Sequence, residues 1–240
     1  MNNNKLAKLY FALNVALIAS IMLMDIFLCF AFRKLIFKSI AAVLTSVLAV
    51  TNLIISIKIY KKRKLLPNIL ICIGVVIGAI ADIMMNINFV AGGVLFALGH
   101  ILYLIALYQI SKFKLKELFI IVLAVIISIV IIFVPYVDFG DFAILIVLYA
   151  IILSLMFAKC INAYLFNAKK SPLYAILAIA GFLFYLSDMM LLFGYFKSSG
   201  ADSIIFDKIC LMLYYPAQIM FAVSILFPIR KLKKQKNKTE

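Results

Sequence analysis

Residues 35–59 read LIFKSIAAVLTSVLAVTNLIISIKI, and the only charges in this stretch, Lys38 and Lys58, lie near its two ends. A helix needs about 20 mostly apolar residues to cross the hydrocarbon core of a bilayer, and this stretch is longer. Strands of a membrane barrel would be about 10 residues long with alternating polarity, a pattern that the stretch lacks. We therefore predict a transmembrane α-helix over residues 35–59.

Comparable apolar stretches recur along the whole chain, in which 68% of the residues are hydrophobic and 14% are charged. Soluble domains average roughly 45–50% apolar and about 25% charged residues, so a water-soluble fold of this length is excluded. The fold class we predict is an all-α polytopic membrane protein, an eight-transmembrane-helix bundle. Residues 1–230 would form this single domain and residues 231–240 a basic cytoplasmic tail. The predicted spans are 9–32, 35–59, 67–86, 89–110, 115–134, 141–166, 171–196 and 203–229.

The distribution of positive charge predicts the orientation of these spans. The first apolar run is longer than the core of a cleaved signal peptide, about 7–15 residues, so we expect it to be the first span. If the N-terminus is inside, all but five of the 24 Lys and Arg residues fall on the inner side, as the positive-inside rule requires. We therefore expect a multi-pass protein of the cell membrane with both termini in the cytoplasm. The five outer residues are Arg33, Lys34, Lys38, Lys197 and Lys208.

The net charge of +15 does not indicate a nucleic-acid partner, because the basic residues occupy short loops and helix ends rather than the face of a folded domain. The four cysteines all lie inside apolar stretches without a CxxC pair, and His100 is the only histidine. A catalytic zinc site normally has three protein ligands, so we expect neither a metal nor another cofactor. The sequence carries no signal for an oligomeric state.

Ionisable groups inside the spans are candidates for function, because each costs about 2.5–3.5 kcal/mol to insert, and polar side chains near them join the set. At a rise of about 1.5 Å per residue, they fall between the middle and the outer end of their spans. Spacing of three or four residues puts His100 and Tyr103, and likewise Tyr214 and Gln218, on shared helix faces. We therefore expect one polar cavity in the outer half of the bilayer. The candidates are Asp25, Lys38, Asp82, His100, Tyr103, Ser187, Asp188, Tyr214, Tyr215 and Gln218.

Two of the aspartates lie in similar sequences. Residues 81–85, ADIMM, resemble residues 187–191, SDMML. A four-span unit repeated twice would run in parallel and would bring Asp82 and Asp188 to the same depth, so two parallel four-helix repeats are a further hypothesis. Asp25 is a secondary candidate, since pairing with Lys38 or Arg33 would give it a purely structural role.

Five short motifs follow one another in the order Phe37-Lys38-Ser39, Ala81-Asp82, Phe96 to Tyr103, Gly181 to Asp188 and Tyr214 to Gln218. In this order the chain resembles the YhhN family of membrane proteins, which includes the lysoplasmalogenases. Ser39 stands where the family has proline and Ala81 where it has glycine, but every ionisable group of the motifs is kept. The resemblance implies an eight-span ether hydrolase that cleaves the vinyl ether of lysoplasmalogens to a fatty aldehyde and a glycerophospho-alcohol.

The chemistry of a vinyl ether suits the candidate residues. The bond is stable to base and labile to acid, since protonation of its β-carbon creates an oxocarbenium ion that water then attacks. Two buried carboxyl groups sharing one site can divide this work, one protonated and one ionised. We therefore expect Asp82 and Asp188 to be the catalytic acid–base pair, with either order of roles. The residues expected to bind or position lipid and water are Lys38, His100, Tyr103, Ser187, Tyr214, Tyr215 and Gln218.

Two other classes of function remain open. Carboxylates beside a histidine within a membrane also suit a small proton-coupled transporter. A transporter would favour helices broken by Gly or Pro at the carboxylates; none is evident there, although Pro216 is expected to interrupt the last span. The other class is a lipid-binding membrane protein without turnover. In every case the expected partners are membrane lipids, with a lysophospholipid as the substrate of the hydrolase.

Overall fold

The computed structural model describes residues 3–31, 35–59, 65–132, 139–196 and 200–227, and every regular element within these ranges is helical. The helices agree with the predicted spans to within a few residues, apart from the start of the first, which is six residues earlier, and the end of the last, which is five residues earlier. Their bounds are α1 (Asn3–Ile26, continued by a π-helical segment Phe27–Ala31), α2 (Leu35–Ile59), α3 (Leu66–Met84), α4 (Phe89–Ile110), α5 (Glu117–Ile132), α6 (Ala143–Asn167), α7 (Leu173–Phe196) and α8 (Gly200–Ser224).

Seven of these helices are long and apolar enough to cross a membrane, and α5 is a shorter apolar helix. The 16 described residues of α5 rise about 24 Å at 1.5 Å each, less than the roughly 30 Å of the hydrocarbon core. The chain is therefore an α-helical, multi-pass membrane protein. The count of eight spans and the parallel repeat stay predictions. The basic tail, residues 231–240, lies outside the described residues.

Local sequence explains several helix ends. Pro67 lies in the first turn of α3, where its missing N–H costs nothing. Asn88 caps α4, because its side-chain oxygen accepts a hydrogen bond of 3.0 Å from the backbone N–H of Ala91. The expectation that Pro216 interrupts the last span is wrong, since α8 runs continuously through it from Gly200 to Ser224. Membrane helices tolerate such prolines because neighbouring groups satisfy the freed backbone carbonyl.

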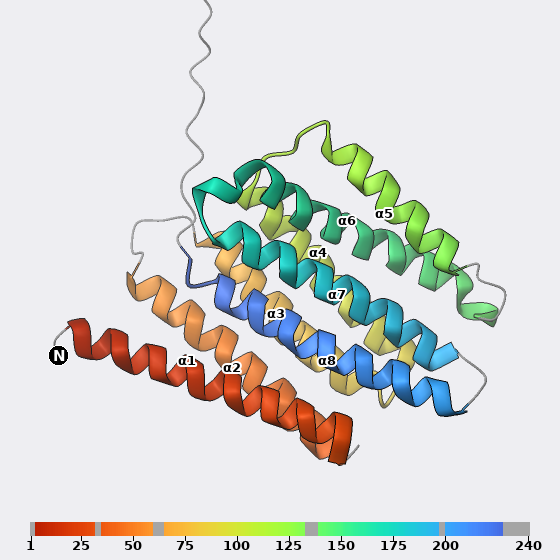
Figure 1. Ribbon diagram of the computed structural model, residues 1–240, viewed down its shortest axis with the longest axis horizontal. Helices are drawn as coiled ribbons and strands as arrows, with labels where there is room; N and C mark the ends of the chain where they lie inside the picture. Colours follow the sequence, from red (N-terminus) through yellow and green to blue (C-terminus); the bar gives the residue numbers. More distant parts are fainter. Residues whose placement is uncertain (1–2, 32–34, 60–64, 133–138, 197–199, 228–240) are drawn as a thin grey trace, which may run out of the picture.

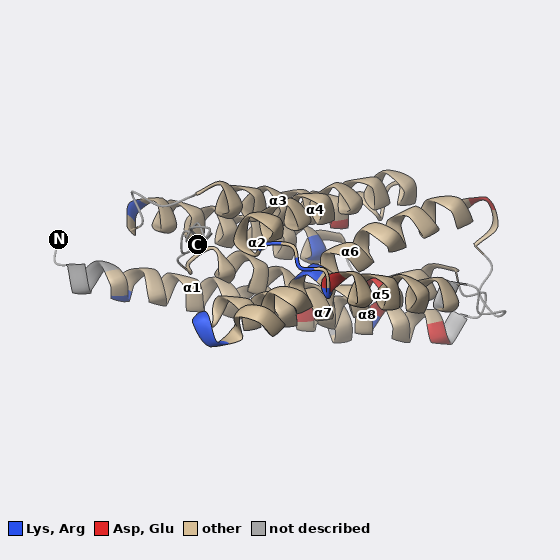
Figure 2. Cartoon of the chain, turned by 90° about the horizontal axis from the view of Figure 1, so that it is seen from above, with Lys and Arg blue, Asp and Glu red and all other residues tan. Residues whose placement is uncertain are grey.

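The helices lie side by side, with α1 and α5 at opposite edges of the bundle (Figure 1). α7 packs along α8 and α3 along α4, while α8 also contacts α2 and α3. The five helices with most of the candidate residues therefore meet in the interior. Outward-facing apolar side chains such as Ile144, which is 77% exposed, suit a lipid environment. Few charged residues interrupt the uncharged ribbon (Figure 2).

A buried ion pair joins α5 to α6. Lys159, which the sequence places on the inner side, is fully buried at 0% exposure, and its Nζ lies 3.0 Å from Oε2 of Glu117. Nζ also donates to the backbone oxygen of Lys112 at 3.3 Å and lies 4.1 Å from the ring centroid of Tyr108. This pair therefore fastens the shorter helix α5 to the bundle.

Removing one partner of this pair is expected to destabilise the protein. Glu117→Gln leaves the Lys159 ammonium buried without its counter-ion, which typically costs about 3–5 kcal/mol. Thermal unfolding in detergent measures the loss. The double variant Glu117→Gln, Lys159→Met removes both charges and is expected to unfold nearer the wild-type temperature. Equal unfolding temperatures for the single variant and the wild type would contradict the structural role of the pair.

Candidate active site

A cavity of about 540 Å³ opens at the end of the bundle where α2, α4 and α8 begin and α3 and α7 end. Its walls come from α2, α3, α4, α7 and α8, together with the π-helical segment after α1 and the connection after α3. Five of the predicted site residues line it, namely Lys38, Asp82, Ser187, Asp188 and Tyr214. In the predicted orientation this end of the bundle is the outer one. The cavity therefore brings residues from distant parts of the sequence into one polar space.

Asp82 is held by two donors. The Nζ of Lys38 lies 2.9 Å from Oδ1 of Asp82, and the hydroxyl of Tyr215 donates to Oδ2 at 2.8 Å. The same hydroxyl lies 3.3 Å from the backbone oxygen of Lys38, so α2, α3 and α8 are tied together at this point. Each carboxylate oxygen has a donor, and the lysine supplies the balancing charge. These contacts suit an ionised Asp82.

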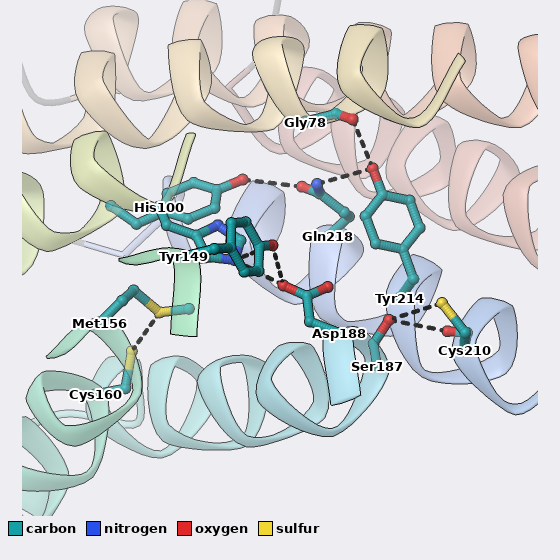
Figure 3. Close-up of polar contacts among 11 residues, drawn as sticks. Gly78, His100, Tyr149, Met156, Cys160, Ser187, Asp188, Cys210, Tyr214 and Gln218 are labelled. Atoms are coloured by element: carbon teal, nitrogen blue, oxygen red, sulfur yellow. Dashed lines mark hydrogen bonds and ion pairs between the residues drawn. The ribbon is translucent and has the colours of Figure 1, made fainter. Parts of the chain in front are cut away.

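Asp188 is held differently, because both of its contacts are made by one oxygen. Nε2 of His100 lies 2.9 Å from Oδ2, and the hydroxyl of Tyr149 donates to the same atom (Figure 3). Tyr149 Oη is also 3.3 Å from Nε2 of His100. Phe184 packs edge-on against the imidazole, with 4.7 Å between ring centroids. Asp188 therefore belongs to a compact triad in which a proton can be shared between the carboxyl group and the imidazole.

Tyr149 was not predicted from the sequence. Its single hydroxyl lies within the apolar helix α6, and the chain has 12 tyrosines. The predicted repeat gives one indication of such a residue, because a partner of Asp82 on the preceding helix suggests a matching partner for Asp188. Asp82 receives one contact from the preceding helix, through Lys38, and one from α8. Asp188 likewise receives one contact from the preceding helix, through Tyr149, and one from α4. The two aspartates are thus contacted from corresponding places in the helix order.

Tyr103 and Gln218 lie behind the cavity rather than on its wall. The hydroxyl of Tyr103 donates to Oε1 of Gln218 at 2.9 Å, and Nε2 of Gln218 donates to the hydroxyl of Tyr214 at 3.1 Å. Tyr214 in turn donates to the backbone oxygen of Gly78 at 2.8 Å (Figure 3). The chain of bonds joins α4, α8 and α3. It therefore fixes Tyr214, the member of this chain that reaches the cavity.

The absence of a side chain at Gly78 is required by this network. A methyl group added there would collide with the amide nitrogen of Gln218. Gly78→Ala is therefore expected to displace the amide and to lower the free energy of unfolding by about 1 kcal/mol for each hydrogen bond broken. Gly93→Ala in α4 is the matched control, because a methyl group there meets nothing within 4 Å. If thermal unfolding does not distinguish the two variants, the network contributes little to stability.

Two further candidates have structural partners. Ser187 donates its hydroxyl to the backbone oxygen of Cys210 at 3.1 Å, which links α7 to α8 beside the cavity. Asp25 is buried, and the thiol of Cys29 lies 3.7 Å from its Oδ1. Lys38, one of its two suggested partners, pairs with Asp82 instead. The other, Arg33, lies outside the described residues. Asp25 is not among the residues that line the cavity.

Within the described residues, no group of three His, Cys, Asp or Glu side chains comes together as a metal site. The cavity does bring together two buried carboxyl groups, those of Asp82 and Asp188, with separate sets of donors, and a third aspartate, Asp207, also lines it. Such a site can hold one carboxyl group ionised beside a lysine and another next to a source of protons. It is equipped for acid–base chemistry on a molecule that enters the cavity.

The comparison with known proteins agrees with the motifs. The model of the YhhN family matches residues 33–225, which cover most of the chain and include all five motifs. No match was found among curated proteins or among solved structures. The matched region runs from the start of α2 to the end of α8 and contains both aspartates and all their partners. The chain belongs to the YhhN family.

Proposed function

We propose that the protein is a membrane hydrolase that cleaves the vinyl ether bond of lysoplasmalogens and releases a fatty aldehyde and a glycerophospho-alcohol. Membership of the YhhN family fits such a role. The observation that carries the proposal is that Asp82 and Asp188 line the same cavity and have different partners. The substrate is a lysophospholipid drawn from the membrane, and no cofactor takes part.

The reaction needs a proton at one stage and a negative charge at the next. Protonation of the β-carbon of the vinyl ether gives an oxocarbenium ion at the carbon that carries the oxygen. Water adds to this carbon and loses a proton, which gives a hemiacetal. The hemiacetal collapses to the aldehyde as the glycerol oxygen takes up a proton. One water molecule is consumed, and the proton spent on carbon is returned.

The two aspartates supply these needs between them. Asp82, ion-paired with Lys38 at 2.9 Å, provides a fixed negative charge. Asp188 lies 2.9 Å from Nε2 of His100, with which it can exchange a proton, and accepts a hydrogen bond from Tyr149. In such a site the buried carboxyl groups can take opposite protonation states, as the acid and base of glycosidases do. Lys38 acts by tuning Asp82 rather than as a free ligand for the lipid phosphate, because its ammonium already contacts the carboxylate.

The remaining site residues would position the substrate and water. Tyr214 and Ser187 line the cavity, and Tyr215 orients Asp82. Tyr103 and Gln218 support Tyr214 from behind. The protein would lie in the cell membrane with both termini in the cytoplasm, which puts the cavity in the outer half of the bilayer.

Purified protein in detergent, incubated with a lysoplasmalogen, tests the proposal. We expect saturable release of aldehyde. The matched control substrate is the saturated alkyl ether of the same chain length, which lacks the double bond that must be protonated and should not be cleaved. A folded protein that binds the lipid but releases no aldehyde would overturn the proposal in favour of a lipid-binding protein or a transporter.

Treatment with a strong metal chelator addresses the rival mechanism of zinc-assisted hydrolysis. We expect aldehyde release to continue at the untreated rate, because the acid and base are carboxyl groups of the chain itself. Activity is measured before chelation, after chelation and after addition of zinc. A loss that zinc restores would show that the hydrolysis depends on a metal.

A further inference from the structure

A second, apolar depression lies beside the candidate active site. It has a volume of about 250 Å³ and is bounded by α4, α6 and α7, together with Met85 after α3. We call it the α4–α6 groove. All its lining residues are apolar except Tyr149 and Asp188. The apolar groove therefore ends on the triad that holds the second aspartate.

The groove and the polar cavity share part of their walls. The residues that line both are Met85, Phe89, Phe96, Asp188 and Leu191. Asp188 is the ionisable residue of this set, whereas Lys38 and Asp82 line the polar cavity and not the groove. A molecule that occupies both spaces therefore places a polar part beside Lys38 and Asp82 and an apolar part against α4 and α6. The point where its polar and apolar parts join lies at Asp188.

The groove is open towards the bilayer. Val94 and Leu98 of α4 are 45% and 47% exposed, and Leu148 of α6 is 56% exposed. Gly93 lies in the wall, and a methyl group added there would meet nothing within 4 Å. A hydrocarbon chain can thus enter sideways from the lipid, and the missing side chain at Gly93 leaves space for it.

We propose that the α4–α6 groove binds the hydrocarbon chain of a single-chain ether phospholipid, with the vinyl ether at Asp188 and the glycerophospho headgroup in the polar cavity. The inference rests on the proposed function and extends it. The vinyl ether joins the chain to the glycerol oxygen, so it falls at the residues that the two spaces share. The unit of Asp188, His100 and Tyr149 then faces the reacting carbons, and Asp82 with Lys38 lies on the headgroup side.

Another apolar depression, separate from the α4–α6 groove, provides an internal comparison. It has a volume of about 370 Å³ and lies between α2 and α3, with no ionisable residue in its lining. It shares no lining residue with the polar cavity. Size alone would favour this depression as the chain site, whereas continuity with the carboxyl groups favours the α4–α6 groove. The two depressions therefore give matched positions for substitution.

Filling the groove tests the inference by activity. Gly93→Phe and Ala97→Phe put a ring into the α4–α6 groove, and Val50→Phe does the same in the depression between α2 and α3. With a hexadecenyl substrate we expect turnover of the groove variants to fall about tenfold or more, the effect of losing contact with one or two methylene groups. A butenyl substrate should be cleaved at the wild-type rate by all three. An equal loss with both substrates, or the same loss in Val50→Phe, would overturn the inference.

Photolabelling of the wild-type protein tests the inference without turnover. The probe is a lysophosphatidylethanolamine with a non-cleavable alkyl ether chain that carries a diazirine near its end. We expect crosslinks to α4 and α6, and competition by unlabelled hexadecenyl substrate. Crosslinks to α2 and α3 instead would overturn the inference even if aldehyde is released. Crosslinks to α4 and α6 without aldehyde release from the hexadecenyl substrate would overturn the proposed function, while the α4–α6 groove would remain the binding site of the hydrocarbon chain.

Discussion

Asp188→Asn is expected to lower the rate of aldehyde release by roughly a hundred- to ten-thousand-fold, the usual contribution of a general acid or base. Asparagine has nearly the shape of aspartate and can still contact Tyr149 and His100, but it cannot accept or deliver the proton. Because the side chain keeps its size, the cavity is expected to keep its form. The rate constant should therefore fall while the Michaelis constant stays near that of the wild type.

Two variants control this result. Asp141→Asn makes the same chemical change at an exposed aspartate outside the cavity, and it should retain wild-type activity. Tyr149→Phe removes one hydrogen bond to Asp188 but leaves the carboxyl group, so its loss of activity should be smaller than that of Asp188→Asn. Thermal unfolding in detergent verifies that each variant is folded. Full aldehyde release by a folded Asp188→Asn protein would show that Asp188 takes no part in the reaction.

The fold was largely predictable because a bilayer leaves few choices to an apolar chain. The bounds predicted for residues 35–59 and 89–110 coincide with α2 and α4. Charges and turn residues end these stretches sharply, and the backbone inside them must satisfy its own hydrogen bonds. The prediction at Pro216 was wrong because a proline in a membrane helix need not end the helix when neighbouring groups satisfy the freed carbonyl.

In the candidate site, only the residues whose charge is costly to insert into a membrane could be predicted from the sequence. Asp82 and Asp188 stand out because a carboxyl group in a span is expensive. Their partners do not follow from this argument. The sequence allows Lys38 to pair with either Asp25 or Asp82, and the packing of α2, α3 and α8 around Tyr215 selects Asp82. Tyr149 carries no charge, so no insertion penalty marks it.

Other features depend on packing that no local pattern records. Lys159 reads as a charge near the inner end of its helix, yet it is enclosed with Glu117 between α5 and α6. The α4–α6 groove exists partly because Gly93 has no side chain, and glycine in an apolar helix has many other uses. Both features arise where separate helices meet, and a single sequence contains no record of which helices are neighbours.

Asp82→Asn is expected to reduce aldehyde release by a factor comparable to that of Asp188→Asn. Its carboxylate supplies the fixed negative charge that stabilises the oxocarbenium ion, and the amide has none. The substitution also leaves Lys38 without its counter-ion. The side chain of Lys38 is 17% exposed, so we expect a loss of stability of roughly 1–3 kcal/mol, below the range for a fully buried pair. A lower unfolding temperature would therefore accompany the lower rate.

The double variant Lys38→Met, Asp82→Asn separates the two effects. Removing both charges abolishes the unpaired ammonium, so the unfolding temperature should recover towards that of the wild type. Aldehyde release should remain as low as in Asp82→Asn, because the charge that stabilises the cation is still missing. If the ion pair only holds α2 against α3, stability and activity will recover together, and Asp82 will be a structural residue. Recovery of stability without activity is the result that a catalytic carboxylate requires.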